Sequence, residues 1–118
     1  MKRLLLATIL ILSVLTIQAQ PRCAVFQFQA GTGVNNEDID GISYMFRAYF
    51  TPSDYKVIPH EIVVKKVTQL GYKQTGMNPQ QLLNVGRKLD ALVIVVGTVT
   101  KLMDEYSVTI DAIMVDIL

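Results

Sequence analysis

The chain has 118 residues, of which 51% are hydrophobic and 18% charged, and its net charge is +1. This length suits one domain with one modest core. The near-neutral charge gives no basis for binding nucleic acid, which normally needs a clustered basic face. One cysteine and one histidine exclude an internal disulfide and a histidine-based zinc site, so we expect no metal and no cofactor.

The first nineteen residues resemble a secretory signal peptide. Lys2 and Arg3 precede an uncharged, largely apolar segment that ends at the small residue Ala19. The segment is too short to span a bilayer, which takes roughly 20 apolar residues. A buried N-terminal helix is the alternative, but the segment has no polar face for water. We expect cleavage after Ala19, leaving an exported domain over residues 20–118 with nine basic and ten acidic side chains, a net charge of −1.

The first half of this domain predicts a strand, a helix and a second strand. Residues 22–29 are rich in β-forming side chains and predict the first strand. Asn35 and Asn36 offer an N-cap to a helix over 37–50, where apolar residues recur at helical spacing. A short strand is expected over 55–58.

Two more helices are expected next. The second helix spans 60–70, and Gly71 ends it. Asn78 followed by Pro79 is a strong start signal for a third helix, which extends to Leu89. Gly86 inside that helix costs about 1 kcal/mol relative to alanine, which indicates close packing at that point.

The chain ends with two long strands that form a predicted hairpin. Residues 91–102 begin with a continuous apolar run, typical of a central strand covered on both faces, and 106–118 form its partner. The order β-α-β-α-α-β-β predicts a single-domain α/β sandwich, a mixed sheet with helices packed on it. Because the chain stops within an apolar strand, either this strand pairs with another chain or the domain continues in a C-terminal piece that is missing here.

Signatures of catalysis are sparse. His60 could act as a general base, and Asp104 or Glu105 could pair with Asp111 for glycosidic chemistry, which would make a small hydrolase. The alternatives are a capping or surface histidine and solvated acids beside a turn, and we favour them. Gly31-Thr32-Gly33 follows a strand as a dinucleotide fingerprint would, but the third glycine is absent, so a strand-to-helix turn is the better interpretation.

Two kinds of residue bear on partners. Cys23 could carry a lipid anchor, although Gln20-Pro21-Arg22 lacks the small apolar residues of a lipidation signal, and the alternative is a buried cysteine at a strand start. The five tyrosines suit a protein interface or the rim of a small core. The three tyrosines we select as partner-binding candidates are Tyr44, Tyr72 and Tyr106.

The chain also resembles a known family. The pattern runs through Ala24-Val25-Phe26-Gln27-Phe28 and is most specific over residues 85–100, where an apolar-Gly helix end precedes Leu89-Asp90-Ala91, four apolar residues and Gly97-Thr98-Val99. These residues are similar to the CsgG/LpoB-type family, which includes a curli-secretion channel subunit, an outer-membrane activator of penicillin-binding proteins, and relatives with the fold of the amino-terminal domain of the Tol-system periplasmic protein. Gly86 and Gly97 take structural roles in this pattern.

The resemblance implies an α/β domain that works in the bacterial envelope by protein–protein contact, without enzymatic activity. A cell-wall synthase or a transport assembly is the implied partner, and contact with the membrane would be peripheral or through a lipid on Cys23. The chain leaves no room for the long membrane-spanning hairpins of the channel-forming branch. A self-assembling subunit that pairs through its terminal strand, giving a homo-oligomer, is the alternative.

Overall fold

The computed structural model describes residues 20–115. The predicted signal peptide and residues 116–118 lie outside the described residues, so cleavage after Ala19 stays a prediction. The helices are α2 (Asn36–Tyr49), α3 (His60–Gln69) and α4 (Pro79–Lys88). The strands are β1 (Arg22–Val25), β2 (Gln29–Ala30), β3 (Lys56–Val57), β4 (Val93–Leu102) and β5 (Glu105–Met114).

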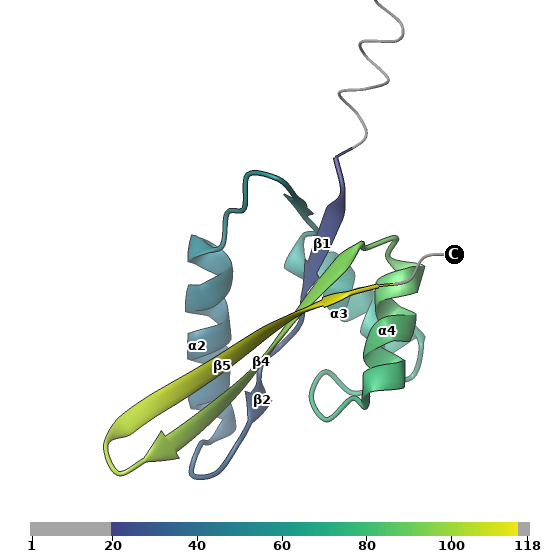
Figure 1. Cartoon of the computed structure of the whole chain (residues 1–118). Helices are drawn as coiled ribbons and strands as arrows, with labels where there is room; N and C mark the ends of the chain where they lie inside the picture. The colour runs from purple at the N-terminus through teal and green to yellow at the C-terminus, as the bar shows by residue number, and fades with distance from the viewer. Residues whose placement is uncertain (1–19, 116–118) are drawn as a thin grey trace, which may run out of the picture.

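The strands form one mixed sheet around β4. β1 and β2 pair in parallel with successive parts of β4, and β3 pairs in parallel with β1. β5 pairs with β4 antiparallel along its whole length, as the predicted hairpin requires. β5 therefore forms one edge of the sheet, and Figure 1 shows the β4–β5 hairpin reaching beyond the helices.

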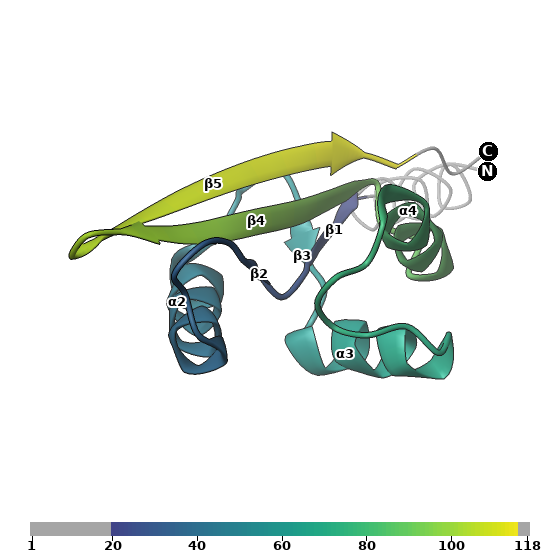
Figure 2. The same ribbon diagram turned by 90° about the horizontal axis from the view of Figure 1, so that it is seen from below.

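Helices cover both faces of the sheet, with α2 on one side and α3 and α4 on the other (Figures 1 and 2). The first half of β4 is buried from both sides, as its apolar run predicted: Ile94 packs in the cluster under α3 and α4, whereas Val93 and Val95 pack in the cluster that contacts α2. The predicted α/β sandwich is confirmed.

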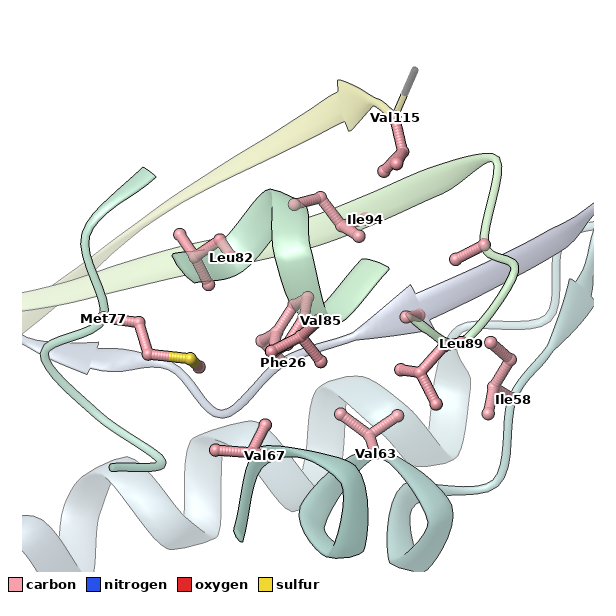
Figure 3. Packing of buried hydrophobic residues seen from close by; sticks show 12 residues of the cluster. Phe26, Ile58, Val63, Val67, Met77, Leu82, Val85, Leu89, Ile94 and Val115 are labelled. Atoms are coloured by element: carbon pink, nitrogen blue, oxygen red, sulfur yellow. The ribbon is translucent and has the colours of Figure 1, made fainter. Parts of the chain in front are cut away.

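The larger part of the core lies between the sheet and the pair α3 and α4. Figure 3 shows Val63 and Val67 of α3 pointing toward Phe26 and Val85. Gly86 lets α4 approach the sheet closely, since a Cβ there would lie 3.0 Å from methyl carbons of Ile94 and Val115. Glycine, which has no side chain, therefore stands at this close contact between α4 and the sheet.

The prediction of one continuous first strand over 22–29 was wrong. β1 and β2 pair with β4 in registers that differ by one residue, so the chain bulges between them. At the bulge the ring of Phe28 lies on Gly97, where a Cβ would be 2.7 Å from the ring carbons. The Phe28 N–H leaves the sheet and donates to Ser43 Oγ of α2 at 3.1 Å. The strand breaks because this ring and this N–H both turn toward α2.

The predicted helix starts are confirmed. Asn35 accepts a hydrogen bond from the Asp38 N–H, and Asn78 forms a reciprocal capping box with Gln81 before Pro79. Within residues 20–115, no helix combines the length and the hydropathy that crossing a membrane requires.

Candidate docking surface

The edge strand β5 carries apolar side chains on one face. Successive side chains of a strand point to opposite faces, and the face toward α2 bears Tyr106, Val108 and Ile110. These side chains are 44%, 41% and 44% exposed, although all three are apolar or aromatic residues of the strand. The sheet therefore ends in an uncovered apolar stripe.

Helix α2 extends this apolar surface from the opposite side. Phe46 is half-buried and packs between Phe28 and Phe50, with ring centroids 5.2 Å and 5.0 Å apart. Beside it, Met45 and Tyr49 are 60% and 83% exposed. Only the inner half of the apolar stripe predicted for this helix is covered.

A groove of about 450 Å³ runs between α2 and β5. Its lining is apolar and consists of Phe28, Ile42, Met45, Phe46, Tyr49, Phe50, Val108 and Ile110. Near one end, the Tyr106 hydroxyl donates to Asp38 Oδ2 at 2.9 Å and holds the hairpin against the helix. The Lys101 ammonium lies 5.3 Å from the centre of the Tyr106 ring. An exposed apolar groove with a polar end is typical of a protein-binding surface.

The three tyrosines selected from the sequence do not come together. Tyr106 adjoins the groove, and Tyr44 is 69% exposed on α2 but does not line it. Tyr72 is half-buried, packs on the core beneath α3 and α4, and accepts a hydrogen bond from Asn84 Nδ2 at 2.9 Å. Tyr72 thus lies on the α3 and α4 side of the sheet, and only Tyr106 of the three adjoins the groove.

The sequence-based selection left out four groove residues, Met45, Tyr49, Val108 and Ile110, although Tyr49 is one of the five tyrosines considered for an interface. The alternation of apolar residues over 106–110 marks a strand with one apolar face, and the spacing of Met45 and Tyr49 places them on one side of a helix. Both patterns are equally typical of residues that are buried in a core. Which apolar faces stay uncovered depends on the tertiary arrangement.

His60 lies at a second, more polar hollow of about 360 Å³ between the starts of α2 and α3. There Gln27 Nε2 donates to Asp40 Oδ1 at 2.6 Å, and Arg47 Nη1 donates to Gln27 Oε1 at 3.4 Å. His60 Nδ1 is buried and has no hydrogen-bond partner among the described residues. Burial lowers the pKa of His60, and the positive charge of Arg47 lowers it further. In the described part of the chain, no serine or cysteine lines this hollow as a nucleophile.

The acidic residues considered for glycosidic chemistry are spread along the hairpin. Glu105 and Asp111 are exposed and six residues apart on β5, which corresponds to roughly 20 Å. Paired catalytic carboxylates stand about 5–9.5 Å apart. Within residues 20–115, no group of three or more histidine, cysteine or acidic residues is placed to hold a metal ion.

The Gly31-Thr32-Gly33 turn is hydrogen-bonded to β4, and Cys23 is buried in the core. The Gly31 N–H donates to the Val99 carbonyl, and the Thr32 carbonyl accepts from the Lys101 N–H, so β4 occupies the backbone groups of the turn. Gly33 has a φ of +80°, which favours glycine. Cys23 is 2% exposed within β1, and burial raises the pKa of its thiol.

Comparisons with known proteins bear on the fold. No family model matches the chain, and no curated protein sequence does. Among solved structures, the LpoB C-terminal domain from Escherichia coli matches over 80% of this chain and 72% of that chain, with a TM-score of 0.57 and 9% sequence identity. The LpoB C-terminal domain from Salmonella enterica matches over 81% of this chain and 84% of that chain, with a TM-score of 0.47 and 10% identity. The match to the Escherichia coli domain shows that this chain has an LpoB-like α/β fold.

Proposed function

We propose that this chain is an exported, non-enzymatic protein of the bacterial envelope that acts by binding another envelope protein through the groove between α2 and β5. The observation that carries the proposal is the exposure of Met45, Tyr49, Val108 and Ile110 around one apolar groove. The LpoB-like fold and the signal-peptide pattern support the envelope as its place of action. A cell-wall synthase or a transport assembly is the class of partner that the family resemblance favours.

The test is affinity capture from envelope extract of the native host, with bound proteins identified by mass spectrometry. Tyr49→Glu places a charge in the groove and should reduce capture of the specific partner at least about tenfold. Tyr44→Glu is the matched control, because Tyr44 is the same residue type, exposed on the same helix, outside the groove. Retained capture by Tyr49→Glu, or loss confined to Tyr44→Glu, would reject the groove as the binding surface.

A self-assembling subunit is the second candidate, because the outer edge of β5 pairs with no other strand among residues 20–115. Self-assembly predicts oligomers whose population rises with concentration, as measured by sedimentation velocity. A monomer throughout the accessible concentration range would reject this candidate.

A further inference from the structure

The outer edge of β5 has backbone groups free to pair. In β4, the carbonyl groups of Val95 and Val99 accept hydrogen bonds from the N–H groups of Phe26 and Gly31. The backbone N–H and C=O groups of the odd-numbered residues of β4 therefore point toward β1 and β2. The even-numbered residues of β4 therefore face β5, where their partners are odd-numbered, as in the pair Thr98 and Thr109. The N–H and C=O groups of the even-numbered β5 residues consequently point away from β4. No other strand of the described chain pairs there.

The same residues of β5 supply the outward-pointing backbone groups and the apolar side chains beside the groove. Tyr106, Val108 and Ile110 direct their backbone groups outward and their side chains toward α2. An extended segment added beside β5 would place every second side chain on the groove side, next to Met45 and Tyr49 of α2. An added strand therefore gains a hydrogen-bonded ladder and an apolar contact together.

The charge of β5 selects among possible strands. Glu105 and Asp111 of β5 and Asp104 of the preceding turn are acidic, and residues 103–114 contain no lysine, arginine or histidine. Glu105 and Asp111 point to the face of β5 away from α2. A strand with lysine or arginine on that face would meet opposite charges, which stabilise cross-strand pairs.

A second copy of β5 fits this edge poorly. Two antiparallel β5 strands can pair only in registers that match even-numbered with even-numbered residues, because only these groups face outward. Each such register that pairs five or more residues of 105–114 puts two carboxylates of Glu105 and Asp111 directly opposite or diagonal to each other. Like charges directly opposite each other are destabilising, and diagonal neighbours are within reach of long side chains. In antiparallel pairing the edge therefore disfavours its own copy and favours a basic strand.

We infer that β5 is the receptor for an extended segment of the partner, which adds as a new edge strand with apolar side chains facing α2 and lysine or arginine on the opposite face. This inference rests on the proposed function and names the kind of segment that the same surface takes.

The test uses the full chain and three synthetic decapeptides. The first alternates lysine and valine, the second alternates glutamate and valine, and the third has five lysines followed by five valines. The lysine–valine alternating peptide should bind at least about tenfold more tightly than either of the others. Its binding should shift the backbone amide resonances of 106–114 and of the Met45–Tyr49 turn in NMR spectra. Equal binding of the three peptides, or binding of none, would overturn the inference.

Two variants examine the backbone and the charge separately. Ala112→Pro removes an outward-facing N–H while leaving the hydrogen bonds to β4 in place, and it should weaken binding of the lysine–valine peptide at least about tenfold. Ala112→Val is its matched control, because it keeps the N–H. Asp111→Lys, an exposed substitution, should shift the preference toward the glutamate–valine peptide. Unchanged binding by Ala112→Pro, or unchanged preference by Asp111→Lys, would reject strand addition or charge selection respectively.

Two further outcomes separate this inference from the proposed function. If Tyr49→Glu loses the envelope partner and Ala112→Pro keeps it, the groove is the docking surface but strand addition is wrong. If both variants keep the partner, the docking surface itself is wrong. A wild-type dimer in sedimentation velocity that Ala112→Pro abolishes would identify a second copy as the occupant and overturn the choice of a basic partner strand.

Discussion

At the residue scale, single glycines and polar atoms determine how closely the layers approach. Gly97 lies beneath the Phe28 ring, and Gly86 lies against Ile94 and Val115, so neither position has room for a Cβ without movement of its neighbours. Gly41 on α2 is the opposite case, since a Cβ there would meet nothing within 4 Å. The same residue type thus has opposite packing requirements at these positions.

Gly97→Ala should lower the free energy of unfolding by about 1–3 kcal/mol, because its methyl group would overlap ring carbons of Phe28. Chemical denaturation measures this change. Gly41→Ala is the matched control and should stabilise the protein by about 0.5–1 kcal/mol through helix propensity. A Gly97→Ala variant as stable as the wild type would show that Phe28 does not rest on Gly97.

At the element scale, the bulge between β1 and β2 joins the sheet to α2. Phe28 is fully buried, and its N–H has left the β-ladder. Ser43, the buried polar residue of α2, supplies the acceptor. This hydrogen bond and the contact between Phe28 and Phe46 hold α2 against the sheet, which fixes one wall of the groove.

Ser43→Ala should lower the free energy of unfolding by about 1–3 kcal/mol, because it leaves a buried N–H without an acceptor. Denaturant titration would measure this loss. Ser53→Ala, in an exposed loop, should be close to neutral. If the two variants have equal stability, the Phe28 N–H does not depend on Ser43.

At the scale of the whole molecule, the fold covers the apolar face of the sheet beneath α3 and α4 and leaves part of the apolar face toward α2 exposed. The face beneath α3 and α4 is closed by a core that includes Phe26, Val85 and Ile94. The face toward α2 is closed over β1 and over the part of β4 that includes Val95 and Val99, and the groove beside β5 stays open. Binding is therefore expected on the α2 side of the molecule.

The mature protein from the native host should have the mass of an unmodified chain that begins at Gln20. Lipidation on Cys23 would require cleavage before it, removing the Pro21 and Arg22 carbonyls that accept hydrogen bonds from Lys56 and Leu92. It would also take a buried thiol out of the core. Intact-mass spectrometry decides the matter. A chain that starts at Cys23 with attached acyl chains would show that the protein is an anchored lipoprotein.

The sequence by itself determined the helices, the central strand and the hairpin of this protein. The helix caps at Asn35 and Asn78 depend on hydrogen bonds between residues close together in the chain. The apolar run at the start of β4 reflects burial of that whole segment. The residues around Gly86 and Gly97 also carried the family resemblance, and that resemblance implied an α/β domain.

Only the tertiary structure decided where the first strand breaks and which apolar residues stay exposed. The break at Phe28 depends on Gly97 and Ser43, which lie far from it in sequence. Tyr49 and Ile110 look like core residues in a local pattern, because a pattern records the apolar face of an element and not whether another element covers it. Coverage is set by how the elements stack, and here nothing in the described chain lies beyond β5 to cover them.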